Sequence, residues 1–364
     1  MAGKNKKESR IVLTGGGTTG HVAVNLALIP ELKKENYQID YLGSKNGIEK
    51  ELISAIPGVT YHSISTGKFR RGKSLNIFIK NLGDIFRIIS GIFQSIYKIG
   101  RLKPQIVFSK GGFVSVPVIL GAWINRIPSL THESDLTPGL ANRLVQPFVK
   151  KVFTTFPETT NYIRKDKGQF LGPIVRDSLK NGDKKRFIRD YKLSPDKPIL
   201  LVMGGSQGAH AINNYVRQNL DSLLEYFQVI HQTGKGGLDQ SKQGTAYLQF
   251  EYINDGLNDL LAAADMVVTR SGSNAIFEFL YYQLPMFLIP YEIGSRGDQI
   301  DNARSFEKEG FAKTILESKL NNELFLDGVL SVYKQRDEMK ARMSQFKFDN
   351  TLNQLIEAIE QFKK

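Results

Sequence analysis

The stretch Arg-Ile-Val-Leu-Thr-Gly-Gly-Gly-Thr-Thr-Gly-His, residues 10–21, decides the fold of the first half of the chain. Its apolar run ends in glycines, and apolar side chains at helical spacing follow from about His21 to Glu35. A buried strand that passes through a glycine turn into a helix is the opening unit of a doubly wound parallel sheet. Residues 199–209, Ile-Leu-Leu-Val-Met-Gly-Gly-Ser-Gln-Gly-Ala, repeat the arrangement. The sequence therefore predicts an α/β protein with two doubly wound, Rossmann-like domains.

Further short apolar runs predict the other strands, and segments of helix length separate them. These runs cover residues 37–42, 105–109, 128–132 and 151–154 in the first half, and 227–231, 266–269, 286–289 and 312–315 in the second. We place an N-terminal domain at 1–172, a C-terminal domain at 173–345, and at 346–364 a C-terminal helix that is able to pack back on the first domain. Ligands bind beyond the carboxyl ends of such strands, so we expect a cleft between facing domains.

The composition narrows the class of protein. The chain has 364 residues, 41% hydrophobic and 23% charged, which is long enough for two domains and apolar enough to fold. It has no cysteine, which excludes disulfides, thiolate metal sites and a catalytic thiol. No uncharged apolar run reaches the length of a membrane-spanning helix, and the basic start does not lead into a secretory signal. We therefore expect a cytoplasmic protein.

The net charge of +13 is concentrated at one end of the chain. Residues 1–110 hold 18 Lys and Arg against 7 Asp and Glu, which suggests an anionic partner. A nucleic-acid-binding protein is one alternative, but no helix-turn-helix or basic platform with interleaved aromatic residues supports it. Residues 66–103 instead combine nine Lys and Arg with apolar side chains at helical spacing, which favours contact with an anionic membrane surface. The predicted membrane contacts are Phe69, Arg70, Arg71, Lys73, Leu75, Phe78, Ile79 and Leu82.

The glycine turns are candidate phosphate sites. Residues 15–20 fit the pattern G-x-G-x-x-G, and the helix after them offers backbone N–H groups to a diphosphate. The same pattern occurs in dinucleotide-binding enzymes, for which Asp40 is the only acidic candidate, and it lies inside the second strand rather than after it. An NAD(P)-dependent oxidoreductase therefore stays as an alternative.

Several polar side chains stand where strands turn into helices. His21 could be a general base, Ser206 could bind phosphate, and Glu278 could accept two ribose hydroxyls; Gln299 and Asn302 suit sugar hydroxyls. Each could also be a structural residue at a helix start. The cluster 132–135, His-Glu-Ser-Asp, follows a strand without the spacing of metal ligands, so we expect chemistry that needs no bound metal.

Taken together, these motifs resemble glycosyltransferase family 28, the bacterial N-acetylglucosaminyltransferases of peptidoglycan synthesis. The resemblance rests on residues 15–21, His132-Glu133 with Pro138-Gly139, residues 172–176, residues 204–209 and Arg270-Ser271-Gly272, and it runs in order over most of the chain. It implies a two-domain GT-B fold and an inverting transfer of N-acetylglucosamine from UDP-N-acetylglucosamine to the 4-hydroxyl of the muramoyl sugar of lipid I. The product is lipid II.

The resemblance also implies roles for individual residues. The implied donor-binding residues are Arg176, Ser206, Gln207, Ile253, Ser271, Gly272, Glu278, Gln299 and Asn302, with Ser206 at the diphosphate, the backbone of Ile253 at the uracil and Glu278 at the ribose. The implied acceptor-diphosphate residues are Gly16, Gly17, Thr18, Thr19 and Gly20. The implied catalytic base is His21, and no metal or other cofactor is implied.

Two departures from the family pattern bear on the acceptor half. Thr19 replaces a glycine of the usual Gly-Gly-Thr-Gly-Gly-His loop, and Asp135 stands where asparagine is common. A carboxylate could accept the proton instead of His21, so the sequence leaves both as candidates. A related transferase acting on another lipid acceptor, such as diacylglycerol, is the alternative function. The lipid acceptor implies a peripheral position on the cytoplasmic face of the bacterial plasma membrane, with cell-wall and division proteins as further candidate partners.

Overall fold

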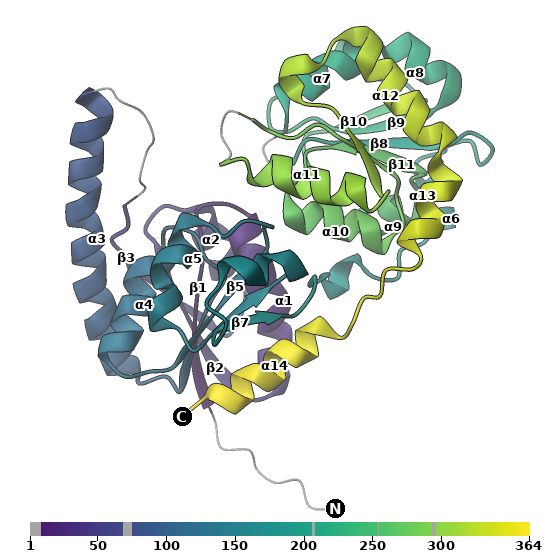
Figure 1. Cartoon of the computed structure of the whole chain (residues 1–364). Coiled ribbons are helices and arrows are strands. Elements are labelled where there is room, and N and C mark those ends of the chain that lie inside the picture. Colours follow the sequence, from purple (N-terminus) through teal and green to yellow (C-terminus); the bar gives the residue numbers. More distant parts are fainter. Residues whose placement is uncertain (1–8, 68–74, 206–207, 254, 293–295) are drawn as a thin grey trace, which may run out of the picture. The chain divides into compact units, whose positions relative to one another are not determined.

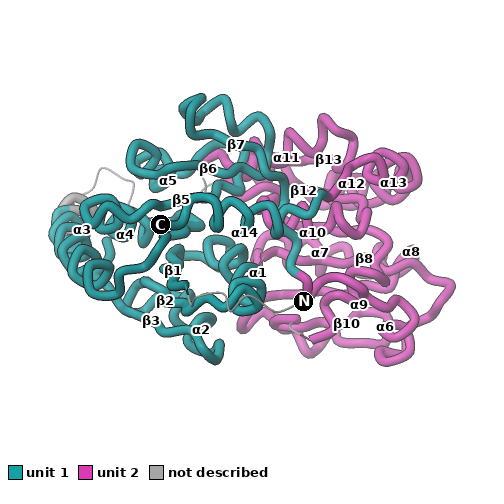
Figure 2. Tube along the Cα trace, turned by 90° about the horizontal axis from the view of Figure 1, so that it is seen from below, with its two compact units in different colours: residues 1–176, 349–364 teal, residues 177–348 magenta. Residues whose placement is uncertain are grey.

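A computed structural model describes residues 9–67, 75–205, 208–253, 255–292 and 296–364, with only the backbone for 75–81. The chain divides into two compact units, residues 1–176 with 349–364 and residues 177–348 (Figure 2). Each unit is built on one parallel sheet flanked by helices (Figure 1). The predicted pair of Rossmann-like sheets is therefore confirmed, and each unit is described by itself below.

The sheet of unit 1 has seven parallel strands in the order β3-β2-β1-β4-β5-β6-β7. Its elements are β1 (Ser9–Thr14), α1 (Gly20–Lys34), β2 (Tyr37–Ser44), α2 (Ile48–Ser54), β3 (Val59–Ile64), α3 (Leu75–Leu102), β4 (Ile106–Ser109), α4 (Ser115–Ile124), β5 (Ser129–Glu133), α5 (Leu140–Val145), β6 (Lys151–Thr154), β7 (Gly168–Phe170) and α14 (Thr351–Phe362). The strand order reverses between β1 and β4, where doubly wound sheets bind their ligands.

Strand β1 shows why this sequence forms a central strand. Ile11 and Leu13 face one apolar cluster, whereas Val12 faces another on the opposite side of the sheet, and all three are fully buried. A strand covered on both faces needs a continuous apolar run, which the sequence supplies. The C-terminal helix α14 packs on the first of these clusters through Leu355 and Ile359, so the end of the chain belongs to unit 1.

The sheet of unit 2 has six parallel strands in the order β10-β9-β8-β11-β12-β13. Its elements are α6 (Lys184–Asp190), β8 (Ile199–Met203), α7 (His210–Gln218), α8 (Leu220–Tyr226), β9 (Gln228–Gln232), β10 (Tyr247–Phe250), α9 (Leu257–Ala263), β11 (Met266–Thr269), α10 (Ser273–Tyr281), β12 (Met286–Leu288), α11 (Asp298–Lys308), β13 (Ala312–Thr314), α12 (Asn322–Lys334) and α13 (Arg336–Met343). Leu200 and Val202 of β8 enter the core of this unit.

Candidate functional site

The first glycine turn lies between β1 and α1 and is crowded by its neighbours. Gly15 and Gly17 have φ of +146° and +93°, which side chains with a Cβ rarely adopt. A Cβ at Gly16 would lie 2.4 Å from Cδ of Glu49, and one at Gly17 would lie 2.4 Å from Cε1 of Phe113. The turn therefore needs glycine both for its backbone conformation and for its close approach to two side chains.

Glu49 fixes the shape of this turn, although no motif in the sequence points to it. Its side chain is fully buried, and its carboxylate accepts hydrogen bonds from Gly17 N–H (3.1 Å) and from the N–H of Ser44 (3.0 Å) as well as from the Ser44 hydroxyl. A buried carboxylate is stable when backbone and side-chain donors surround it. The sequence offered only a weak signal, two acids, Glu49 and Glu51, on a short helix after β2.

His21 lies on the first turn of α1, directly after the glycines. Its Nδ1 is 2.8 Å from Thr18 Oγ1, and its backbone N–H donates to the carbonyl of Thr18 at 3.1 Å. Thr19, the departure from the family loop, has φ −56° and ψ −37°. Those angles are right-handed helical and suit threonine, so this position does not need the conformational freedom of glycine.

A second polar cluster follows β5 at the same edge of the sheet. Glu133 is buried, and its carboxylate accepts from the N–H groups of Asp135 (3.1 Å) and Gly139 (2.8 Å) and from the side-chain amide of Asn142 (2.9 Å). Burial and the nearby Asp135 carboxylate raise the pKa of Glu133, whereas Lys110 acts in the opposite direction. Asp135, the alternative base, stands two residues after the end of β5, and its side chain is partly exposed.

Lys110 and His132 are buried beside this cluster. Lys110 directly follows β4 and donates through its ammonium group to Ser134 Oγ. Burial lowers the pKa of Lys110. Burial, together with Lys110, also lowers the pKa of His132, which keeps that imidazole neutral. Its Nε2 lies at a long distance, 3.4 Å, from Thr155 Oγ1. Both predicted catalytic groups, His21 and Asp135, thus lie near the carboxyl ends of strands, β1 and β5, of the same sheet.

Asp40, the acid required by the dinucleotide alternative, has other partners. It is 3% exposed, lies inside β2, contacts His62 Nε2 at 2.6 Å and lies 3.6 Å from the guanidinium of Arg10. A ribose would need this carboxylate at an exposed strand end. The position of Asp40 therefore gives no support to an NAD(P) site.

In unit 2, hydrogen bonds join the end of β11 to the start of α11. The hydroxyl of Ser271 donates to the carbonyl of Gln299 at 2.7 Å, and the side-chain amide of Asn302 donates to the carbonyl of Ser271 at 3.1 Å. The backbone N–H of Tyr291 donates to Oε1 of Gln299 at 2.9 Å. Ser271 and Asn302 are both 0% exposed, so in this structure their hydrogen bonds hold the segment after β11 against α11.

The remaining predicted donor residues lie in unit 2, except Arg176, which belongs to unit 1. Ile253 is buried, and its backbone N–H already donates to Oε1 of Gln232 at 3.0 Å. Gly272 precedes α10, Glu278 is a partly exposed residue of the same helix, and Arg176 is the last residue of the first segment of unit 1. Ser206 and Gln207 lie outside the described residues.

The predicted membrane segment corresponds to α3. Phe69, Arg70, Arg71 and Lys73 lie outside the described residues, and Leu75, Phe78 and Ile79 belong to the helix. From Leu82 onward the helix shows an exposed apolar face, which we call the α3 face: Leu82, Ile85, Phe86, Ile89, Phe93 and Tyr97, between 39% and 68% exposed. None of the helices described here is long and apolar enough to span a membrane.

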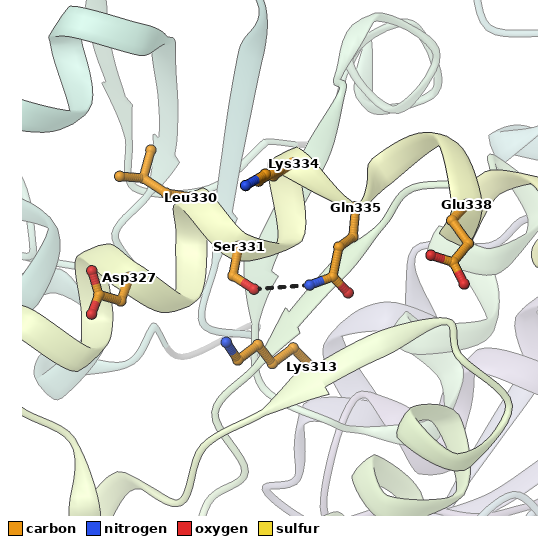
Figure 3. A pocket seen from close by; sticks show the side chains of 7 residues that line it. All are labelled: Lys313, Asp327, Leu330, Ser331, Lys334, Gln335 and Glu338. Carbon is orange, nitrogen blue, oxygen red and sulfur yellow. Dashed lines mark hydrogen bonds between the residues drawn. The ribbon is translucent and has the colours of Figure 1, made fainter.

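A shallow pocket of about 640 Å³ lies elsewhere in unit 2, among β13, α12 and α13 (Figure 3). Its lining residues include Lys313, Asp327 and Glu338, and one hydrogen bond of 3.2 Å joins Gln335 to Ser331. None of the predicted site residues lines it. In the parts of the chain that the structure describes, no group of three or more His, Asp or Glu is arranged to hold a metal ion.

Sequence comparison places known domains on both halves of the chain. Residues 11–154 match the glycosyltransferase family 28 N-terminal domain, and residues 199–359 match the C-terminal domain of the same family. A relative from Oceanobacillus iheyensis is 48% identical over 99% of this chain and 100% of its own length. Another, from Staphylococcus saprophyticus, is 49% identical over 96% of this chain and 98% of its own length. Both are named "UDP-N-acetylglucosamine--N-acetylmuramyl-(pentapeptide) pyrophosphoryl-undecaprenol N-acetylglucosamine transferase".

Comparison with solved structures gives the same fold. The crystal structure of Acinetobacter baumannii MurG matches with a TM-score of 0.77 and 22% identity, over 97% of this chain and 99% of that one. The glycotransferase of kitacinnamycin matches with a TM-score of 0.74 and 15% identity, over 99% of this chain and all of the other. Together with the two parallel sheets, these matches confirm the predicted GT-B class of two Rossmann-like domains.

Proposed function

The chain belongs to glycosyltransferase family 28, and on that premise we propose that it transfers N-acetylglucosamine from UDP-N-acetylglucosamine to the muramoyl sugar of lipid I, forming lipid II. The observation that carries the proposal is the full-length identity of 48–49% to relatives whose names give this donor and this acceptor. Those names specify a muramyl diphospholipid, which favours lipid I over the diacylglycerol alternative. The enzyme acts in peptidoglycan synthesis.

The acceptor half is unit 1. The glycine turn, residues 16–20, leads into α1, whose first N–H groups and positive dipole end suit the acceptor diphosphate. Crowding by Glu49 and Phe113 fixes the shape of this turn before any ligand binds. A fixed turn favours binding because no conformational entropy is lost there when the diphosphate arrives.

Chemistry begins when the 4-hydroxyl oxygen attacks C1 of N-acetylglucosamine and UDP leaves from the opposite face, which inverts the configuration. A general base takes the hydroxyl proton. In the tautomer in which Nδ1 of His21 donates to Thr18, Nε2 is the nitrogen that accepts this proton. Asp135, which is partly exposed at the same edge of the sheet, is the second candidate.

The donor half is unit 2. Glu278 on α10 holds the ribose hydroxyls, Ser206 and Gln207 bind the diphosphate, and the backbone of Ile253 binds the uracil. The hydrogen bonds among Ser271, Gln299 and Asn302 support this site by fixing the start of α11 against the end of β11. Arg176 and the N-termini of the helices stabilise the charge on departing UDP, so the reaction proceeds without a bound metal.

Membrane association is a further part of the proposal. The residues of the α3 face, at positions 82, 85, 86, 89, 93 and 97, recur three or four residues apart, which places their apolar side chains on one side of the helix. The segment around it carries nine basic residues and one acid. An apolar face flanked by positive charge suits the anionic surface in which a polyprenyl acceptor lies. The protein then binds the cytoplasmic face of the plasma membrane peripherally.

Ligand protection tests the donor assignment. UDP should bind the folded protein and not the unfolded chain, and should therefore raise the thermal unfolding temperature. NADH at the same concentration should not raise it. A Glu278→Ala variant should lose the protection by UDP, and Glu309→Ala, an exposed acid of the same unit, should keep it. Protection by NADH in place of UDP would contradict the donor assignment and restore the oxidoreductase alternative.

A further inference from the structure

Among the lysines and arginines in the described part of the chain, Lys110 is the one that is buried, with 2% of it exposed. It directly follows β4, next to β1, so it stands where the strand order of the sheet reverses. Its backbone N–H donates to the carbonyl of Thr14 at 2.9 Å. An isolated buried ammonium group is costly, and such groups are found paired with opposite charges or polar partners.

The partners of Lys110 lie at the end of β5 and in the turn that follows it. Its ammonium group donates to Ser134 Oγ, and the carboxylates of Glu133 and Asp135 act on it as opposite charges. The carboxylate of Glu133 in turn accepts hydrogen bonds from the backbone N–H groups of Asp135 and Gly139. One cation thus acts on two carboxylates, and it is tied by a hydrogen bond to the residue between them.

The other side of Lys110 meets the glycine turn. A Cβ at Gly15 would lie 3.1 Å from Cβ of Lys110. Two residues further on, a Cβ at Gly112 would lie 2.2 Å from the carbonyl oxygen of Gly16 and 3.3 Å from Cγ of His21. The segment that starts with Lys110 therefore packs against the turn assigned to the acceptor diphosphate and against one candidate base, His21. Its ammonium group binds Ser134, the residue before the other candidate base, Asp135.

We propose that Lys110 is a positioning residue of the acceptor half: it holds the Glu133–Asp135 turn in place and offsets its two carboxylates, so that an anionic diphosphate acceptor can bind beside them. The inference rests on the proposed function, because it takes the acceptor to be a diphosphate. With Lys110 charged, the formal charge of the cluster is one negative; with Lys110 neutral, it is two negative. The second negative charge repels the acceptor but not the donor.

The experiment measures KM for a soluble lipid I analogue and for UDP-N-acetylglucosamine with purified full-length protein. Lys110→Met should raise the acceptor KM by about tenfold, since a unit charge acts strongly at short range in a partly buried site, and should leave the donor KM within about twofold. Lys110→Met combined with Glu133→Gln returns the cluster to one negative charge and should recover most of the acceptor KM. Lys150→Met, an exposed lysine of the same unit, controls for net charge.

Thermal unfolding identifies variants that fold poorly. If Lys110→Met is one of them, Lys110→Arg, which keeps the charge, replaces it in the comparison with Lys150→Met. An unchanged acceptor KM in folded Lys110→Met would overturn the inference, as would equal rises in the KM for donor and acceptor or a double variant no better than the single one. Failure of the wild-type protein to use the lipid I analogue at all would count against the proposed function instead. The two failures are therefore distinguishable.

Discussion

Replacing Gly17 by alanine should destabilise unit 1 far more than a glycine replacement usually does. Gly17 has φ +93°, and the added Cβ would lie 2.4 Å from Cε1 and 2.9 Å from Cδ1 of Phe113. A residue with a Cβ pays about 1–2 kcal/mol for the backbone conformation, and overpacking costs about 1–3 kcal/mol more. Phe113 packs against an apolar cluster of the unit, which limits how far its ring can move.

The chain supplies a matched control in Gly58, which lies in the same unit. Its φ is +75°, and the nearest atoms to an added Cβ are the end of the Lys33 side chain at 3.8 Å. Gly58→Ala therefore keeps the backbone cost and lacks the crowding. For a unit of this size, the melting temperature should fall by about 5–15 °C in Gly17→Ala and by about 2–6 °C in Gly58→Ala.

Differential scanning calorimetry measures both values, and acceptor KM gives a functional readout. Gly17→Ala with Phe113→Leu removes part of the crowding and should recover part of the lost stability. Equal losses in Gly17→Ala and Gly58→Ala, or no recovery in the double variant, would refute the claim that Phe113 fixes the glycine turn.

Three further predictions concern the base, pH and the membrane. In steady-state kinetics, His21→Ala should lower kcat by about a hundredfold or more with little change in the KM for UDP-N-acetylglucosamine. An unaffected kcat, together with a large loss of kcat in Asp135→Asn, would show that Asp135 is the base instead. Burial, with Arg217 nearby, lowers the pKa of His231 to about 3. Between pH 6.5 and pH 3 the unfolded chain therefore binds a proton at this residue that the folded chain does not. The free energy of unfolding should fall over this range, by about 2–3 kcal/mol at pH 4.5. Calorimetry across pH should show a weaker slope in His231→Gln, and an identical slope would contradict this assignment. Phe86→Ser with Phe93→Ser, at positions 67% and 68% exposed, should weaken sedimentation with anionic vesicles by about a hundredfold; undiminished binding would show that the α3 face does not enter the membrane.

The sequence was sufficient to predict the central strands. Ile11, Val12 and Leu13 are apolar because both faces of β1 are covered, and the same holds for Leu200, Leu201 and Val202. The edge strands β3, β7 and β10 were not predicted. In β3 only Ile64 is buried, so its apolar pattern is weak, and β7 has only three residues.

The candidate site was predictable where a local motif defines it and not where distant segments meet. The glycine turns and His21 stand next to strands in the sequence. Lys110 and Glu49 gave no such signal, because their roles depend on strands and helices that come together only in the folded sheet. Asn302 shows the opposite limit: its amide suggests a sugar ligand, but the fold buries it and uses it to hold Ser271.

The central claim is tested most directly by following labelled N-acetylglucosamine from its UDP donor onto a lipid I analogue, with diacylglycerol as a parallel acceptor and a chelator present. The account predicts label on lipid I alone, in the β configuration at the new bond and at an undiminished rate with the chelator. Label on diacylglycerol alone would contradict the assigned acceptor while keeping the fold and donor, and no transfer to either acceptor would contradict the proposed reaction itself.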